Sequence, residues 1–505
     1  MTENINEKMP VSKKLSDNKE WIYNELSPDN SFDLMWREIT VAGKDAALLF
    51  VDGFAKDDIM LWIMRRLTSI ERDQITPNTF EKIVKKQINY LETDGVDDLH
   101  KVVDTILSGP IALFVDGLDQ AIVIDARTYP ARGPQEPDLE RVVRGSRDGF
   151  VETIVFNTAL IRRRIRDPKL RMEIMNVGRR SKQDICISYI DDIANPRLVE
   201  KVKSKLTEID IDGLPMAEKS VEELITPGSF WNPFPRVRYT ERPDVAAQHL
   251  LEGHVLIIVD TSPSVIILPA TFFHHVQHAE EFREAPPVGA YLRWVRFIGM
   301  IGSVFIAPLW LLFSLEPSLL PESLKFIGPT DVGKVGLMWQ FLFAQLGIDL
   351  MRMAAVHTPS ALATALGLIA AVLIGQVAID IGLFAPEVIL YMAVAAIGSF
   401  ATPSYEMSMA NRLVRVALLV GTGLLRLPGF AGVTVLYFMI LALTKSFGVP
   451  YLWPLIPFNY KAFKSIIIRS PVPIQNLRPS ILKPIDPDRQ PAVAMKPKDD
   501  PDEKE

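Results

Sequence analysis

The chain has 505 residues, a formal net charge of −6 and a single cysteine, Cys186. One cysteine excludes a disulfide framework and any zinc or iron–sulfur site built from several cysteines. The hydropathy is uneven, because residues 1–290 and 449–505 are charged whereas 291–448 are apolar enough to lie in a lipid bilayer. The N-terminal sequence is polar and lacks an apolar signal segment, so we expect the domain that precedes the first span to remain in the cytosol.

The polar N-terminal region predicts a soluble α/β domain. Residues 1–29 form a polar leader, and short β-rich runs then alternate with amphipathic helical patterns over 30–127 and 150–290. The Pro- and Gly-rich stretch 128–149 is typical of a linker, so the domain is expected to have two subdomains. Cys186 lies in the apolar run DICISYI, which favours a buried strand position over a nucleophile.

Three runs in this domain resemble one another, and they read ALLFVDGFAKDD, ALFVDGLDQAIVI and LIIVDTSPSVIIL. Each places an apolar strand before a turn that contains an aspartate, and the last two continue into a second strand, which indicates β-hairpins. Carboxylates in such turns usually accept hydrogen bonds from backbone N–H groups. We therefore expect Asp52, Asp116 and Asp260 to stabilise the turns rather than to act in catalysis.

A basic cluster follows the linker. Residues 141–182 contain twelve Lys and Arg against four Asp and Glu. This excess favours a contact between protomers or subdomains, or an anionic membrane surface. Nucleic acid is disfavoured, because aromatic residues do not alternate with the arginines. The residues predicted to form a basic interface are Arg162, Arg163, Arg164, Arg179 and Arg180.

Three histidines, His274, His275 and His278, have the spacing of metal ligands on a helix. The glutamate of an HExxH motif is missing and no third ligand is evident, so no metal site is predicted. We expect the histidines to lie at the membrane-facing base of the soluble domain. The sequence contains no phosphate loop and no nucleophile–base pair, so neither an enzyme nor a cofactor is predicted.

The apolar block, residues 291–448, predicts a polytopic helical membrane domain. The candidate spans are 297–315, 336–355, 361–384, 387–403, 412–426 and 429–447. Positive charge at both ends of the block places both ends in the cytosol, which requires an even number of crossings. The charges favour six spans. The alternative is four spans, with 336–355 lying in the interface and 412–447 broken. The tail, 449–505, is expected to be cytosolic and disordered at its end.

The span 361–384 has no Lys or Arg but contains polar residues that lipid does not tolerate without a partner or water. Small residues at every fourth position predict a ridge for helix packing, and they are Ala363, Gly367, Ala371 and Gly375. The side roughly opposite carries Ile369, Val372, Gln376 and Asp380. We expect this side to line a pore that is constricted at Ile369 and Val372 and gates by dewetting. A packed internal span, whose polar groups bond neighbouring helices, is the alternative.

The sequence around Phe234 resembles the signature region of the A subunits of GerA-type bacterial spore germinant receptors, and it reads PFPRVRYTERPDVAAQHLLEGHVLIIVDTSP. Further motifs resemble this family over residues 30–470, and they include EPDLERVVRGSRDGFVETIVFNTALIRRRIRDP, VGRRSK, IANP and SFGVPYL. The resemblance implies a multi-pass protein of the spore inner membrane. It also implies a homo-oligomeric, pentameric ion channel that acts with other inner-membrane germination proteins. A secondary transporter and a membrane scaffold that recruits germination partners are the alternative functions.

Overall fold

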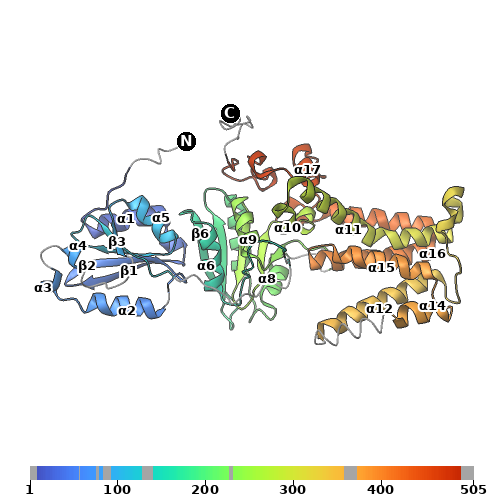
Figure 1. The fold of residues 1–505 in the computed structure, drawn as a ribbon, viewed down its shortest axis with the longest axis horizontal. Helices are drawn as coiled ribbons and strands as arrows, with labels where there is room; N and C mark the ends of the chain where they lie inside the picture. The colour runs from blue at the N-terminus through green and yellow to red at the C-terminus, as the bar shows by residue number, and fades with distance from the viewer. Residues whose placement is uncertain are drawn as a thin grey trace, which may run out of the picture. The chain divides into compact units, whose positions relative to one another are not determined.

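The structure, a computed structural model, describes most of the chain. The described residues are 8–55, 57–75, 79–83, 93–127, 140, 142–226, 231–357 and 372–490. By compactness the chain separates into two units, which we call the α/β unit and the helical unit (Figure 1). The α/β unit comprises Met1–Pro227, Tyr239–Pro269 and Pro471–Glu505, and the helical unit comprises Gly228–Arg238 and Ala270–Ser470. The boundary therefore falls before the predicted one at residue 290, and the first part of the predicted tail groups with the helices.

The first subdomain of the α/β unit is a five-stranded antiparallel sheet in the order β1-β2-β4-β5-β3. Its strands are β1 (Leu34–Val41), β2 (Lys44–Val51), β3 (Thr93–Val96), β4 (Ile111–Val115) and β5 (Ala121–Ile124). Helices α1 (Leu15–Leu26) and α5 (Leu99–Leu107) cover one face, and α2 (Asp57–Thr68) covers the other (Figure 1). The short helices α3 (Arg72–Ile75) and α4 (Thr79–Lys82) follow α2. Alternate side chains of β2 enter separate cores, with Leu49 on the α1 side and Leu48 on the α2 side, as the two-residue period of a strand requires.

The second subdomain repeats this topology. Its sheet has the order β6-β7-β9-β10-β8, which is the order of the first sheet when each is numbered from its own first strand. The strands are β6 (Leu170–Val177), β7 (Gln183–Ile190), β8 (Arg238–Thr240), β9 (Val255–Val259) and β10 (Val265–Leu268). Helices α6 (Ile154–Arg164) and α9 (Pro243–Leu251) pack against each other and against β7 and β9. The subdomain also contains α7 (Pro196–Thr207) and α8 (Ala217–Ile225).

The predicted turn aspartates are confirmed as hydrogen-bond acceptors for the backbone. Asp52 accepts from the N–H of the next residue at 3.0 Å. Asp116, after β4, accepts from the first residue of α1 at 3.1 Å, and Asp260, after β9, accepts from the first residue of α6 at 3.0 Å. Asp116 and Asp260 thus each accept a hydrogen bond from an N–H at the start of the first helix of their own subdomain, where the backbone N–H groups have no partner within the helix. The same capping device in both subdomains strengthens the case for an internal repeat.

Two buried asparagines show the same correspondence. Asn18 of α1 exchanges two hydrogen bonds with the backbone of Ser12, at 2.8 and 2.7 Å. Asn157 of α6 makes the equivalent pair with the backbone of Val151, at 2.8 and 2.6 Å. Both amides are buried, so both must be fully paired to avoid the cost of an unsatisfied polar group. The two subdomains therefore share details of their hydrogen bonding as well as the order of their strands.

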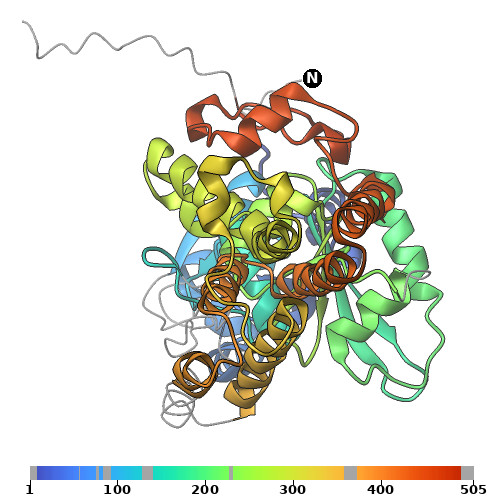
Figure 2. The same ribbon diagram turned by 90° about the vertical axis from the view of Figure 1, so that its right-hand side faces the viewer.

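The helical unit contains two helices that are long and apolar enough to cross a membrane, namely α11 (Pro286–Leu315) and α16 (Tyr405–Leu443), in the part of the chain that the structure describes. The helix α15 (Pro386–Phe400) is apolar but shorter. The remaining helices are α10 (Ala279–Arg283), α12 (Leu337–His357), α14 (Ala378–Asp380) and α17 (Tyr460–Ile467). Figure 2 shows the long helices of this unit nearly end-on. The sequence predicted six spans, and their number stays a prediction. Two of them, 412–426 and 429–447, correspond to the two parts of α16 on either side of a break at Arg426.

The merged helix α16 is broken at Arg426, where the backbone has φ 54° and ψ −130°. Gly421 and Gly429 lie on either side of this break and are very close to each other. A Cβ built on Gly429 would lie 1.9 Å from the carbonyl oxygen of Gly421. Glycine is required here, since any side chain would collide with the backbone of the other arm. The break therefore divides α16 into two helical arms that contact each other at glycines.

Helices α11 and α15 also meet at glycines. A Cβ built on Gly398 would lie 2.2 Å from the carbonyl oxygen of Gly299. Contact between helix backbones through small residues is the packing mode of membrane helices, in which dispersion forces replace the hydrophobic effect. Helices α11 and α15 therefore pack through small residues, and the same packing mode for the span 361–384 stays a prediction.

Candidate functional site

A polar network lies among the apolar helices and joins α12 to α16. The guanidinium of Arg415 is buried and donates to Oε1 of Gln345 from Nε at 3.1 Å and from Nη2 at 2.7 Å. It also donates from Nη1 to the carbonyl oxygen of Ser303 in α11 at 2.6 Å. Asp349 accepts from Gln345 Nε2 at 2.7 Å and forms an ion pair with Arg412. Ionisable side chains are costly to bury among apolar helices, so their presence there indicates a functional role.

The outward side of α12 has the opposite character. Over residues 337–354, where the side chains are described, the large exposed ones are apolar, and they are Trp339, Phe343, Leu346, Leu350 and Met353. A helix that directs polar groups toward its neighbours and apolar groups outward is typical of a membrane environment, and atypical of a water-soluble bundle. Gln345 and Asp349, two polar residues within the predicted span 336–355, therefore have internal partners. Sequence reasoning missed this network, although the four-residue spacing of Gln345 and Asp349 on one helix face was a usable signal.

The predicted pore segment is described in part. Ala363, Gly367, Ile369 and Ala371 lie outside the described residues. From Val372 to Val377 the backbone is a π-helix, which leads directly into α14. Gln376 and Asp380 are both exposed, and no atom lies within 4 Å of the position that a Cβ on Gly375 would occupy. The two polar residues of this segment are therefore accessible, and the roles of the whole set stay predictions.

The basic cluster separates into internal and surface arginines. Arg162 is completely buried and forms a two-pronged ion pair with Asp33, with Nε to Oδ2 at 2.7 Å and Nη2 to Oδ1 at 3.1 Å. Arg164 pairs with Asp148 at 2.5 Å inside the same subdomain. Arg163 is exposed. The pair formed by Arg162 joins the two subdomains, because Asp33 directly precedes β1.

The two remaining arginines of the predicted interface are on the surface. Arg179 pairs with Asp210 at 2.5 Å, and Arg180 pairs with Asp212 at 3.6 Å. The side chain of Arg180 is 84% exposed. Whether these residues meet another protomer or a membrane stays a prediction.

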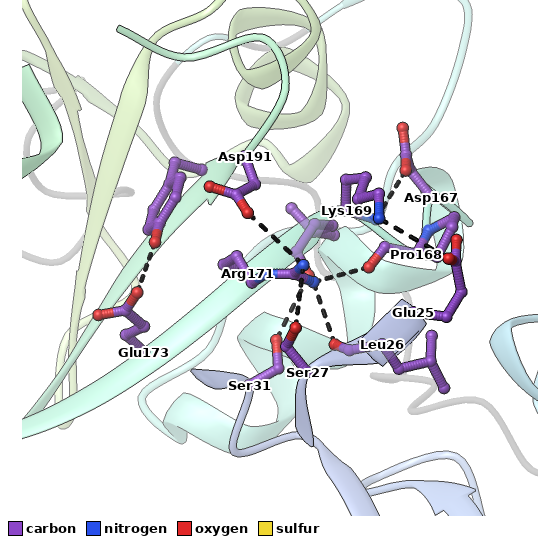
Figure 3. Close-up of polar contacts among 12 residues, drawn as sticks. Glu25, Leu26, Ser27, Ser31, Asp167, Pro168, Lys169, Arg171, Glu173 and Asp191 are labelled. Atoms are coloured by element: carbon purple, nitrogen blue, oxygen red, sulfur yellow. Dashed lines mark hydrogen bonds and ion pairs between the residues drawn. The ribbon is translucent and has the colours of Figure 1, made fainter. Parts of the chain in front are cut away.

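Arg171 reinforces the junction between the subdomains (Figure 3). From β6 it donates Nη1 to the carbonyl oxygen of Leu26 at 3.0 Å and to that of Pro168 at 2.7 Å. It also lies 3.6 Å from Asp191. Leu26 ends α1 of the first subdomain, so the bond caps that helix from the second subdomain. A contact between subdomains was one of the alternatives that the sequence left open for the basic cluster, but Arg171 was not singled out, because its acceptors are backbone carbonyls that carry no sequence signal.

The histidines have local structural roles. His274 forms a capping box with Thr271 at the start of a 3₁₀ turn, and His278 caps α10 by accepting from the N–H of Glu280 at 3.3 Å. His275 is buried, and burial together with the nearby Arg238 lowers its pKa to about 3. Among the residues that the structure describes, no three His, Cys, Asp or Glu side chains are grouped as metal ligands. Cys186 is buried in β7, where burial raises its pKa, so the predicted strand position is confirmed.

The chain thus combines a duplicated α/β unit with a unit of apolar helices that contains a buried ionic network. The family described as Bacillus/Clostridium GerA spore germination protein matches residues 21–481. The chain belongs to this family, so the resemblance found in the sequence motifs is confirmed.

Individual relatives agree with this assignment. The chain is 50% identical to the stage V sporulation protein AF of Bacillus subtilis (strain 168), over 97% of this chain and 99% of that protein. It is 30% identical to spore germination protein A1 of the same organism, over 80% of this chain and 84% of that protein. It is also similar to the crystal structure of the N-terminal domain of the A subunit of the Bacillus megaterium spore germinant receptor GerK3. The identity is 27%, the TM-score is 0.42, and the match covers 53% of this chain and 99% of that chain.

Proposed function

We propose that this chain is the subunit of a homo-oligomeric, pentameric ion channel that releases ions across the spore inner membrane during germination. The segment from Ile369 to Asp380 lines the pore, with the constriction at Ile369 and Val372 and the polar pair Gln376 and Asp380 at the wider mouth. The observation that carries the proposal is the exposure of Gln376 and Asp380 in a unit whose other exposed helix faces are largely apolar. A ring of carboxylates at the mouth favours cations.

Two features of the helical unit support the proposed membrane channel. The helix α12 keeps its polar residues on the side of the polar network and exposes only large apolar side chains outward. The π-helix at Val372–Val377 lies at the proposed constriction, and π-helical turns occur frequently at functional sites. In this arrangement both termini lie in the cytosol, and the channel works with other germination proteins of the inner membrane.

The decisive experiment removes the proposed constriction. Val372→Ala takes two methyl groups from each protomer, which widens the ring and lowers the cost of wetting it. We expect spores with this variant to germinate prematurely or to lose stored ions during development, and Val372→Phe to slow germination. In a packed helix the same change would only leave a small cavity costing about 1–2 kcal/mol, so the protein would lose abundance instead of leaking.

A matched control changes the neighbouring residue on the predicted packing side. Ala371→Leu should reduce assembly without producing a leak, because it places bulk between helices rather than in the pore. Normal, ion-tight spores with normal protein levels for Val372→Ala would contradict the channel. Flux that saturates would then favour a secondary transporter, and no flux at all would favour a scaffold.

The topology has its own test. In a Cys186→Ser background, single cysteines at Ser12 and Asp488 should both be labelled by an impermeant reagent from the cytosolic side alone. Labelling of the two positions from opposite sides would require an odd number of spans and would contradict the proposed arrangement.

A further inference from the structure

The stretch after the last long helix, residues 455–468, exposes a group of apolar and basic side chains. We call this stretch, which contains α17, the interfacial segment. Before α17, the apolar side chains of Leu455, Ile456 and Phe458 are exposed, and Phe458 is 65% exposed. Exposed aromatic and aliphatic side chains gathered in a short stretch indicate a surface that is covered by something apolar.

The helix α17 adds positive charge to this surface. Tyr460, Lys461 and Lys464 are exposed, and helical geometry places them within an arc of about 100°. Ile468, directly after the helix, is also exposed. The buried side chain of the helix, Ile466, lies on the opposite side. A helix turn that presents lysines and a tyrosine next to apolar side chains has the composition of an interfacial anchor on an anionic bilayer.

The structure also fixes where the interfacial segment sits along α11. Arg293 is buried and donates from Nη1 to the carbonyl oxygens of Ser465 at 3.0 Å and Ile466 at 2.6 Å, which caps the last turn of α17. Trp294 donates from Nε1 to the carbonyl oxygen of Ile467 at 2.8 Å. These residues directly precede the apolar stretch of α11, where arginine and tryptophan mark a membrane–water boundary. The capped end of α17 is therefore held at that boundary.

A buried carboxylate keeps this anchor in place. Glu281 of α10 is buried and accepts from Nε of Arg293 at 2.7 Å. The guanidinium thus satisfies a carboxylate and two helix carbonyls at once, which gives it one fixed orientation. Because α10, α11 and α17 are tied together by one side chain, the exposed face of α17 is presented rigidly.

We propose that the interfacial segment lies in the headgroup region of the cytosolic leaflet and binds anionic phospholipid through Lys461 and Lys464, with Leu455, Ile456 and Phe458 inserted among the acyl chains. The charge complementarity between two exposed lysines and anionic headgroups selects the lipid surface as the occupant. The inference rests on the proposed membrane position of α11, but it does not depend on ion conduction.

The test places an environment-sensitive fluorophore at Phe458→Cys in the full chain with Cys186→Ser. The protein is reconstituted in vesicles of phosphatidylcholine and phosphatidylglycerol in which one of the two lipids is brominated, so that contact quenches the fluorophore. Ile298→Cys, on the exposed apolar side of α11, is the membrane control, and Asp488→Cys is the aqueous control. We expect quenching at positions 458 and 298 and none at 488.

The lipid preference is measured with the same label at position 458. Brominated phosphatidylglycerol should quench at least about twofold more than brominated phosphatidylcholine at equal mole fraction. Lys461→Gln with Lys464→Gln should remove this preference, whereas Lys445→Gln, at an exposed lysine of the same unit, should leave it unchanged.

The outcomes separate the alternatives. Quenching at 298 without quenching at 458 would overturn the inference and leave the proposed channel intact. Equal quenching by the two lipids would overturn the anionic preference. Cross-linking between labelled copies together with protection from brominated lipid would assign the surface to a second copy and also overturn the inference. Absence of quenching at 298 would overturn both this inference and the membrane position on which the proposed function depends.

Discussion

The buried ion pair between Arg162 and Asp33 is expected to hold the two subdomains together, and Arg162→Leu tests this directly. The substitution leaves the Asp33 carboxylate without its cation, although that side chain is only 1% exposed. It also removes the donors to the carbonyl oxygens of Asp167 and Leu170. Removing one partner of a buried pair costs about 3–5 kcal/mol, because the charge that remains is still desolvated.

Hydrogen exchange provides the assay, since two amides cross the same junction. The N–H of Phe32 donates to the carbonyl oxygen of Met172 at 3.0 Å, and the N–H of Met172 donates to Oγ of Ser31 at 3.0 Å. Opening of the junction exposes both amides to water. A loss of about 3–5 kcal/mol lowers their protection by a factor of roughly 10² to 5 × 10³, measured by mass spectrometry on the full chain.

The control and the double variant sharpen this prediction. Arg180→Leu, at a largely exposed arginine of the same cluster, should leave the protection of both amides within about threefold of the unmodified protein. Arg162→Leu combined with Asp33→Leu should recover much of the loss, because no uncompensated charge remains. If Arg162→Leu exchanges at the rate of the unmodified protein, the pair does not hold the junction and the reasoning from its burial is wrong.

Two further predictions concern the helical unit. Gly398→Ala should lower the midpoint of thermal unfolding in detergent by an amount equivalent to about 1–3 kcal/mol, because the new Cβ collides with the backbone of Gly299. Gly302→Ala is the matched control, because a Cβ at that position would meet no described neighbouring atom within 4 Å. An equal effect of the two substitutions would contradict the packing argument. Burial and the nearby Arg238 lower the pKa of His275 to about 3, so this side chain stays neutral in the folded protein. In the unfolded chain it takes up a proton below about pH 6.5. The free energy of unfolding therefore falls as the pH falls, by about 2 kcal/mol at pH 5. His275→Asn should therefore show a smaller drop in thermal midpoint between pH 7 and pH 5, and an unchanged drop would assign the pH dependence to other groups.

Local patterns were sufficient for several features of this protein. Turn chemistry predicted the hairpins that contain Asp116 and Asp260, and the apolar run around Cys186 predicted a buried strand. These features depend on neighbours in the chain, so the information needed lies within a dozen residues. The hydropathy also separated a charged α/β region from an apolar helical region, and the long motifs identified the family.

Contacts between distant residues decided the rest. The run of three arginines that ends α6 left a contact between protomers, a contact between subdomains and a membrane surface as alternatives, and for Arg162 the buried pair with Asp33 of the other subdomain decided for the second. The same holds for Gln345 and Arg415, which lie in apolar helices and are hydrogen-bonded to each other. A polar group is costly to bury only if it is unpaired, and pairing across long chain separations leaves no periodic signal in the sequence. The roles of buried charges were therefore set by tertiary structure, whereas strands, turns and apolar helices followed from local order.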